Sequence, residues 1–164
     1  MKPAAVLETV LYAADLDAAE TFYTTVLGLG VYGKVPGRHL FFKLGEQMLL
    51  IFNPRVTVEP PRPNAKLPVP PHGATGEGHV CFAATATEID VWKRRLQDQG
   101  IEIEADFEWP QGGRSIYFRD PLGQLLELAA YKFVPPVGVT PGEVLLEAHR
   151  IRVAEGAHHI ADSH

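Results

Sequence analysis

The sequence predicts an α+β fold in which two tandem β-α-β-β-β modules form curved, partly open, barrel-like sheets around one cavity, followed by a C-terminal helix. Three observations support this prediction. Short apolar runs with period-two alternation mark strands, a capped amphipathic segment marks one helix in each half, and the second half repeats the element order of the first. A chain of 164 residues is long enough for one such domain with a real core.

The first half opens with a strand and a helix. Residues 6–15 carry apolar side chains on both faces, which predicts a strand covered on both sides. Asp15 is placed to cap the following helix and Gly28 to end it. Two further strands, residues 39–45 and 47–53, form a predicted hairpin. The apolar stripe of the helix consists of Leu16, Ala19, Phe22, Tyr23 and Val26.

A proline-rich stretch separates the two halves. Seven prolines fall between residues 54 and 71, and the stretch ends in HGATGEG. Proline cannot donate to a strand ladder or continue a helix, so we expect a long connector that contains neither. Long ordered connectors in compact domains often cover sites, which makes residues 54–78 a candidate lid.

The second half repeats the order of the first. Residues 78–85 predict a strand, and the next helix is expected to open at Thr87, with Asp90 three residues later as a capping box, and to end at Gly100. Three more strands are predicted, at residues 101–109, 114–120 and 124–131.

These elements divide the chain into a domain and a tail. The domain spans residues 1–132, with module one at about 5–54, the connector at 54–78 and module two at about 78–132. Residues 133–164 are expected to form a linker and an amphipathic helix that packs on the domain or on a second subunit.

Composition excludes several classes of partner. The formal net charge is -5 and Lys and Arg form no cluster, which argues against nucleic acid and anionic membranes. No run approaches the ~18 apolar residues of a membrane span. The single cysteine, Cys81, rules out an internal disulfide and suits a reducing cytoplasm, where we place the protein. The linear motifs HExxH and CxxC are absent.

The internal repeat brings metal-ligand side chains to equivalent places. Aligning the halves lays Glu8 on His79 in the first strands and Leu49 on Glu127 in the last strands. If the modules pair about a pseudo-twofold axis, these positions face one another. Two carboxylates and one imidazole suit a divalent ion, with positions left for water and substrate. A carboxylate among apolar neighbours, as at Glu127, is costly unless a cation offsets its charge.

Three segments carry a family resemblance: ETVLYAADLDAAETFYTTVLGL in the first half, GHVCFAA at the start of the second, and GGRSIYFRDPLGQLLEL near its end. They resemble the vicinal oxygen chelate superfamily (glyoxalase, bleomycin resistance and extradiol dioxygenase proteins) over residues 5 to about 132. The resemblance implies one divalent metal ion (Zn, Ni, Mn, Co or Fe) held by Glu8, His79 and Glu127. Leu49 departs from glyoxalase I, which has a fourth ligand there, and Glu8 stands where the family often has His or Gln.

The resemblance also implies a function. It points to a glyoxalase-like, metal-dependent enzyme that performs isomerase or lyase chemistry on a small oxygenated metabolite. The metal would hold two vicinal oxygens of this substrate. The resemblance also points to a homodimer. The alternatives are a metal-free small-molecule binding protein of the bleomycin-resistance type and an oxygenase like the extradiol dioxygenases. The expected catalytic residues are Glu127, Glu8 and His72. The expected substrate-binding residues are Arg114, Trp109, Tyr12, Phe42 and Tyr117.

Overall fold

In the computed structural model of the chain, residues 1, 3, 6–110 and 112–130 are described. The chain divides into two compact units, Met1–Tyr131 and Lys132–His164. The predicted linker and C-terminal helix, residues 133–164, lie outside the described residues. None of the helices that the structure describes has the length and apolar character needed to cross a membrane.

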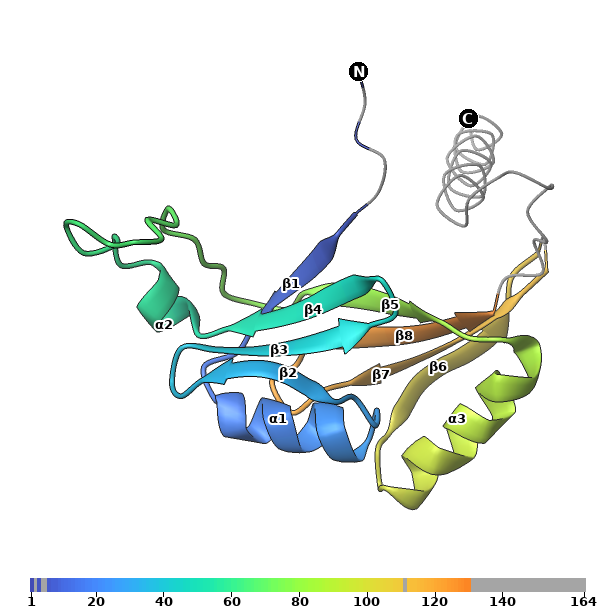
Figure 1. The fold of residues 1–164 in the computed structure, drawn as a ribbon. Helices are drawn as coiled ribbons and strands as arrows, with labels where there is room; N and C mark the ends of the chain where they lie inside the picture. Colours follow the sequence, from blue (N-terminus) through green and yellow to red (C-terminus); the bar gives the residue numbers. More distant parts are fainter. Residues whose placement is uncertain (2, 4–5, 111, 131–164) are drawn as a thin grey trace, which may run out of the picture. The chain divides into compact units, whose positions relative to one another are not determined.

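The predicted repeat of two β-α-β-β-β modules is confirmed (Figure 1). Each module builds one four-stranded sheet, in the orders β1-β4-β3-β2 and β5-β8-β7-β6, and the first and last strands of each module pair in parallel. The sheets are not closed into a barrel. Module one comprises β1 (Glu8–Tyr12), α1 (Leu16–Thr25), β2 (Val31–Val35), β3 (His39–Leu44) and β4 (Gln47–Phe52). Module two comprises β5 (His79–Ala83), α3 (Ala86–Asp98), β6 (Ile103–Glu108), β7 (Arg114–Arg119) and β8 (Leu125–Ala130).

Among the described residues, the two sheets carry helices α1 and α3 on one face and neither helix on the other. Helices α1 and α3 lie on the same side of the two sheets (Figure 1). We call the opposite side the helix-free face; in the first strand it carries Glu8, Val10 and Tyr12. Glu8 and Val10 are exposed there, so the prediction that this strand is covered on both sides is wrong for the described residues.

The predicted start of α1 is confirmed, and the predicted start of α3 is two residues too late. Asp15 caps α1, its carboxylate accepting from the amide of Ala18, and Gly28 follows the helix with φ +71°, as predicted. Helix α3 begins earlier than expected, because its cap is Thr85 and not Thr87. Thr85 forms a complete capping box with Glu88, three residues on.

The connector contains a helical turn, although it was predicted to contain no helix. Residues Pro54–Thr57 form α2, with Asn53 as its cap. The prolines do not prevent this turn, because Pro54 stands in the first turn, where its missing N–H has no intrahelical partner to lose.

The strand register corrects the alignment of the two modules by one residue. In module one, Val10 and Phe41 both pair with Leu50; in module two, the equivalent Cys81 and Tyr117 both pair with Glu127. The counterpart of Glu127 is therefore Leu50, and the alignment with Leu49 is wrong. Neighbouring residues in a strand point to opposite faces, so this one-residue difference moves the position from the core to the helix-free face.

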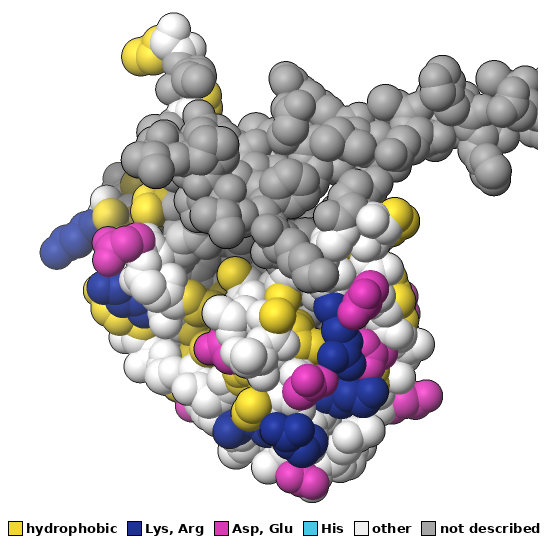
Figure 2. All heavy atoms as spheres, turned by 90° about the vertical axis from the view of Figure 1, so that its right-hand side faces the viewer, with side chains coloured by type: hydrophobic (Ala, Val, Ile, Leu, Met, Phe, Trp, Pro, Cys, Tyr) yellow, Lys and Arg dark blue, Asp and Glu magenta, His cyan; other side chains and the backbone are white. Residues whose placement is uncertain are grey.

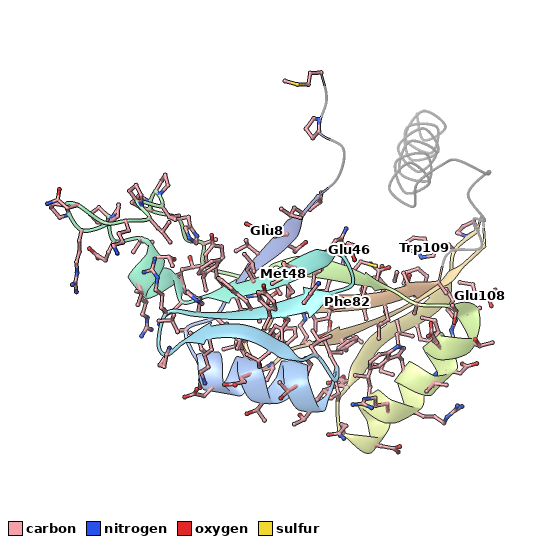
Figure 3. All side chains as sticks on the ribbon, in the orientation of Figure 1. Glu8, Glu46, Met48, Phe82, Glu108 and Trp109 are labelled. Carbon is pink, nitrogen blue, oxygen red and sulfur yellow. The ribbon has the colours of Figure 1, made fainter. Side chains whose placement is uncertain are left out.

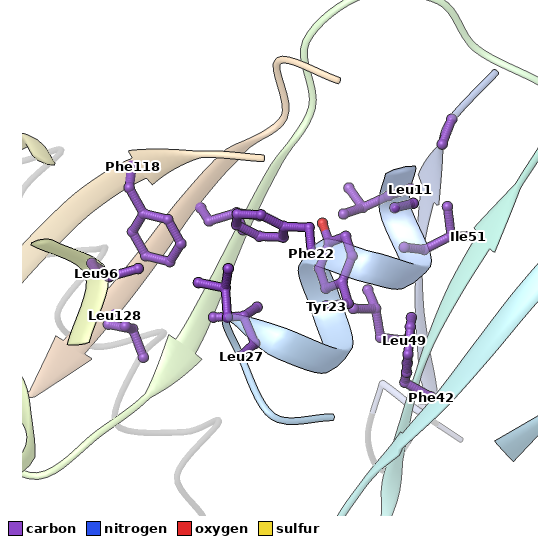
Figure 4. Packing of buried hydrophobic residues seen from close by; sticks show 14 of the residues in the cluster. Leu11, Phe22, Tyr23, Leu27, Phe42, Leu49, Ile51, Leu96, Phe118 and Leu128 are labelled. Atoms are coloured by element: carbon purple, nitrogen blue, oxygen red, sulfur yellow. The ribbon is translucent and has the colours of Figure 1, made fainter. Parts of the chain in front are cut away.

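One hydrophobic core joins both modules. In Figure 4, Phe22 and Tyr23 of α1 lie between a group from module one, with Phe42 and Leu49, and a group from module two, with Phe118. These side chains are nearly or fully buried, and packed apolar surface of this kind is the main driving force of folding. The predicted stripe on α1 is confirmed, since all five of its residues are buried.

The segment DPLGQ joins the modules through hydrogen bonds. Asp120 accepts from the amides of Leu122 and Gln124 with Oδ1 and from the Tyr23 hydroxyl with Oδ2, at 3.0 Å. The Gln124 amide group accepts from the Gly78 N–H and donates to the Tyr12 carbonyl. This segment therefore fixes the first strands of both modules next to the start of β8.

Charges of both signs are mixed on the surface near α3. Figure 2 shows Lys and Arg side chains interspersed with Asp and Glu on the face that it presents. Several charged side chains of module two are paired: Arg114 binds Asp90 and Asp106, and Arg119 binds Glu77 and Glu104. Paired charges of this kind make a solvated surface and not a single-sign field that attracts polyanions.

Candidate functional site

The strands of module two place a carboxylate on the helix-free face. In β8, Leu126 and Leu128 point into the core, and Glu127 between them points the other way. The same alternation brings Ser115 and Tyr117 of β7 and His79 of β5 to that face. Glu127 is only 4% exposed and Ser115 is fully buried, so this carboxylate sits in protein and not in bulk water.

Two side chains contact the two carboxylate oxygens of Glu127, one each. The Ser115 hydroxyl donates to Oε1 at 2.6 Å, and the Trp109 indole N–H donates to the Ser115 oxygen at 2.9 Å. His79 Nε2 lies 3.2 Å from Oε2. Glu127 is therefore held from one side and paired with an imidazole on the other.

The second nitrogen of His79 fixes how the ring is used. Nδ1 lies 3.1 Å from the carbonyl oxygen of Leu125, which only accepts hydrogen bonds. Nδ1 must therefore carry the proton of that bond. Nε2 then faces Glu127 either as a second N–H or as a lone pair that needs a cation between itself and the carboxylate. Metal-binding histidines commonly have this arrangement, with the distal nitrogen bonded to a carbonyl or carboxylate.

The separation of these donors fits a divalent ion. Two ligands at about 2.0–2.2 Å from one ion, with an angle of about 90–110° between them, lie about 2.8–3.6 Å apart. The Nε2 to Oε2 distance of 3.2 Å falls in this range. One imidazole and one carboxylate also match the preference of borderline divalent metals such as Zn, Co, Ni, Fe and Mn. His79 and Glu127 could therefore supply two of the ligands of such an ion.

Glu8 does not complete this set within one chain. No group of three His, Cys, Asp or Glu side chains converges among the described residues. Glu8 projects from β1, the edge strand of the module-one sheet, and its main chain pairs with Met48 (Figure 3). The predicted third ligand therefore stays a prediction.

Aromatic side chains cluster on the helix-free face of module one. The Tyr12 hydroxyl lies 2.9 Å from Nδ1 of His72, which reaches this face from the connector. The His72 ring packs edge-on against Phe52, and Phe41 stacks on His39 at 4.1 Å. Burial, reinforced by the charge of Arg38, lowers the pKa of His39. These rings give His72 and Tyr12 a fixed position beside an apolar surface.

Two predicted substrate contacts lie away from the site. Phe42 is fully buried in the core against Tyr23, and its neighbour Phe41 occupies the helix-free face instead. The Arg114 guanidinium is held by both oxygens of Asp106 and by Asp90. Hydrogen bonds from Arg114 hold the pKa of Asp106 well below its usual range, and those same bonds raise the pKa of Arg114. The arginine thus already has carboxylate partners and cannot serve a substrate anion without losing them.

The other two predicted contacts of module two do lie at the site. The Tyr117 ring stacks on the His79 ring, with centroids 6.1 Å apart, and the Trp109 indole donates a hydrogen bond to Ser115. Sequence reasoning missed Ser115 and Phe107, whose ring stacks on Tyr117 and packs edge-on against Trp109. The alternation in RSIYFR carries the signal for Ser115, because it places this residue on the same face as Tyr117.

Comparison with known proteins places the chain in a family. The Glyoxalase/Bleomycin resistance protein/Dioxygenase superfamily matches residues 5–128. A solved lactoylglutathione lyase from Agrobacterium tumefaciens is 46% identical over 79% of this chain and 96% of its own, with a TM-score of 0.73. A glyoxalase/bleomycin resistance protein/dioxygenase from Nocardioides is 25% identical over 85% of this chain and 91% of its own, with a TM-score of 0.63.

A more distant likeness concerns the fold alone. A fosfomycin resistance protein from Listeria monocytogenes is 21% identical over 90% of this chain and 99% of its own, with a TM-score of 0.59. No curated protein matches the chain. The family match over most of the described residues, the repeated modules and the 46% identity agree, and the chain belongs to the Glyoxalase/Bleomycin resistance protein/Dioxygenase superfamily.

Proposed function

We propose that the protein is a metal-dependent enzyme of the glyoxalase type that performs isomerase or lyase chemistry on a small oxygenated metabolite. The observation that carries this proposal is the pair of donors formed by His79 Nε2 and Glu127 Oε2, 3.2 Å apart. The 46% identity to a lactoylglutathione lyase supports the reaction class and makes lactoylglutathione the first substrate to test. The lone Cys81 fits a cytoplasmic enzyme.

The residues of the site suit proton transfer next to a carbonyl. A bound divalent ion supplies Lewis acidity, which stabilises negative charge on the substrate oxygens. Glu127 would accept a proton from the carbon beside the carbonyl and return it to the adjacent carbon, with Ser115 bound to its Oε1 atom. The stacked rings of Tyr117 and Phe107 form an apolar surface next to His79.

A second copy of the chain would complete the site. Glu8 has no partner ligands within the described part of one chain, and it stands on an edge strand. The adjoining Val6 and Leu7 are 66% and 70% exposed, which is unfavourable unless another surface covers them. In a homodimer, Glu8 of one subunit would join His79 and Glu127 of the other, and His72 and Tyr12 would contact the substrate from the same side as Glu8.

Metal binding tests the proposal directly. Wild-type protein, stripped with a chelator, should take up one divalent ion per chain, measured by elemental analysis and by Co²⁺ titration. The substitutions His79→Ala and Glu127→Gln should abolish this uptake, because each removes one of the two donors. Glu46→Gln is the matched control, since Glu46 lies in the turn between β3 and β4 (Figure 3). A wild-type chain that takes up no metal would contradict the proposal.

Mixed dimers test the shared site. When Glu8→Ala chains are refolded together with His79→Ala chains, each mixed dimer contains one site with all three native ligands, provided that the site draws on both subunits. Metal binding and turnover of lactoylglutathione should therefore return in the mixture, although each variant alone lacks them. No recovery in proven mixed dimers would mean that the site lies within one chain.

The second candidate is a metal-free binding protein of the bleomycin-resistance type. It is favoured by Leu50, the apolar counterpart of Glu127, and by the aromatic cluster around Phe52, because an apolar face of this kind can hold a ligand without an ion. The His79→Ala and Glu127→Gln variants distinguish the two candidates. Ligand binding that persists unchanged in the His79→Ala and Glu127→Gln variants supports the binding protein, and loss of metal in these variants supports the enzyme.

A further inference from the structure

We propose that Trp109 and Ser115 are positioning residues that hold the Glu127 carboxylate in one orientation, so that only its Oε2 atom is available to a ligand. The use of that oxygen for a metal rests on the proposed function. The orientation itself is a property of the protein chain. It depends on three side chains in a row: the indole of Trp109, the hydroxyl of Ser115 and the carboxylate.

The direction of the chain of hydrogen bonds follows from the available protons. The indole Nε1–H is only a donor, so it must donate to the Ser115 oxygen, at 2.9 Å. The hydroxyl has one proton, and Glu127 Oε1 lies 2.6 Å away. With its oxygen accepting from Trp109, Ser115 directs that proton to Glu127. A carboxylate receives such a bond more strongly than a neutral acceptor does, which favours this orientation.

Burial makes the arrangement hard to replace. Ser115 is fully buried, with 0% of its surface exposed to solvent, and Glu127 is 4% exposed. Water therefore cannot readily take the place of the hydroxyl. The Trp109 ring is itself held by Phe107, which packs edge-on against it with ring centroids 4.7 Å apart. Removal of the hydroxyl leaves Oε1 without this donor and lets the carboxylate rotate about its terminal bond.

The consequence for the site is a carboxylate that binds through one oxygen. Oε1 is occupied by Ser115, and Oε2 faces His79, whose ring is fixed by the Leu125 carbonyl. His79 and Glu127 are thus both oriented before any ligand arrives. Residues that orient metal ligands in this way typically change metal affinity by about 10- to 100-fold when they are substituted.

The hydrogen bonds can be tested in metal-free protein. The chain has two tryptophans, Trp92 and Trp109, so the indole N–H signals in a ¹H–¹⁵N spectrum give one reporter and one internal reference. Ser115→Ala should shift the Trp109 signal upfield, because the indole loses its acceptor, and leave Trp92 in place. Ser115→Thr, which keeps the hydroxyl, should restore the wild-type position. If Ser115→Ala does not fold, Glu127→Gln should still shift the Trp109 signal. A Trp109 signal that moves in neither variant would overturn the inference.

Co²⁺ binding tests the consequence for the ligand. Ser115→Ala and Trp109→Phe should weaken Co²⁺ binding by about 10-fold or more and alter the visible Co²⁺ spectrum, because a rotating carboxylate changes the coordination. Ser115→Thr should retain wild-type affinity. Wild-type affinity and spectrum in both of the first two variants would contradict the positioning role. A wild-type chain that binds no Co²⁺ would instead defeat the proposed enzyme, while the indole signals would still decide whether Trp109, Ser115 and Glu127 form a chain of hydrogen bonds.

Discussion

The hydrogen bond between Tyr23 and Asp120 offers the sharpest test of how the two modules are joined. Tyr23 lies on α1 in module one, and its hydroxyl donates to Asp120 Oδ2 of module two at 3.0 Å. The substitution Tyr23→Phe removes one oxygen and keeps the ring in the core, where Tyr23 is 0% exposed. The change therefore isolates the hydrogen bond from the packing.

The expected loss can be estimated from the partners. A hydrogen bond to a charged group contributes about 1.5–3 kcal/mol to stability. Asp120 keeps its two backbone donors, at Leu122 and Gln124, so the carboxylate is not left without partners. We therefore expect Tyr23→Phe to lower the free energy of unfolding by about 1.5–3 kcal/mol. With a urea m-value of about 1–3 kcal/mol/M, the unfolding midpoint should fall by roughly 1 M.

Urea unfolding followed by circular dichroism measures this difference, with Tyr32→Phe as the matched control. Tyr32 is 69% exposed, and loss of its hydroxyl should change stability by less than about 0.5 kcal/mol. Burial, and next the charge of Asp120, raise the pKa of Tyr23 above its ordinary value of 10.0. A raised pKa contributes stability that is fully present below pH 10 and is lost as the pH rises further, so wild type should lose more stability above pH 10 than Tyr23→Phe does. Equal stabilities for Tyr23→Phe and Tyr32→Phe would refute the reasoning.

Two further predictions concern the surface of module two. The pKa of Asp106 is lowered, chiefly by hydrogen bonds from Arg114, so its stabilising effect is present above the ordinary value of 3.8 and is lost as the pH falls below it. Urea unfolding across acidic pH should therefore show a slope for wild type that is steeper than that of Asp106→Asn, by up to about 1.4 kcal/mol per pH unit; parallel curves would speak against the pairing. Thr85→Ala should cost about 1 kcal/mol of stability and Thr87→Ala less than about 0.5, measured by thermal unfolding, and the reverse order would restore Thr87 as the cap of α3.

The capping signals show how far local sequence can determine a helix. At α1, Asp15 is the only polar cap candidate before the apolar stripe, and the structure uses it. At α3, Thr85 and Thr87 each have an acidic residue three positions later, so the sequence offers two equivalent starts. The structure begins the helix at Thr85, directly after β5 ends at Ala83. Which start is used depends on where the strand releases the chain, and this is a property of the sheet.

The candidate site was only half predictable for a similar reason. His79 was found because the repeat aligns it with Glu8, and Glu127 because it is a carboxylate among apolar neighbours; the structure brings these two together. Ser115 lies next to Arg114 in sequence, but only the pairing of β7 with β8 brings its hydroxyl to Glu127. The choice between Leu49 and Leu50 could not be made from sequence, since both are apolar and a strand pattern does not fix its own register.

The sequence by itself determined the repeated modules, the ends of α1, the apolar stripe on that helix and the family, because periodicity, caps and a specific closing motif are local properties of the chain. The tertiary structure decided the rest. Strand pairing placed Phe42 in the core and Phe41 on the helix-free face, tied Arg114 to Asp106, and set His79, Ser115 and Trp109 around Glu127. These outcomes depend on register and on contacts between residues far apart in the chain, and a one-residue shift of a strand exchanges its two faces.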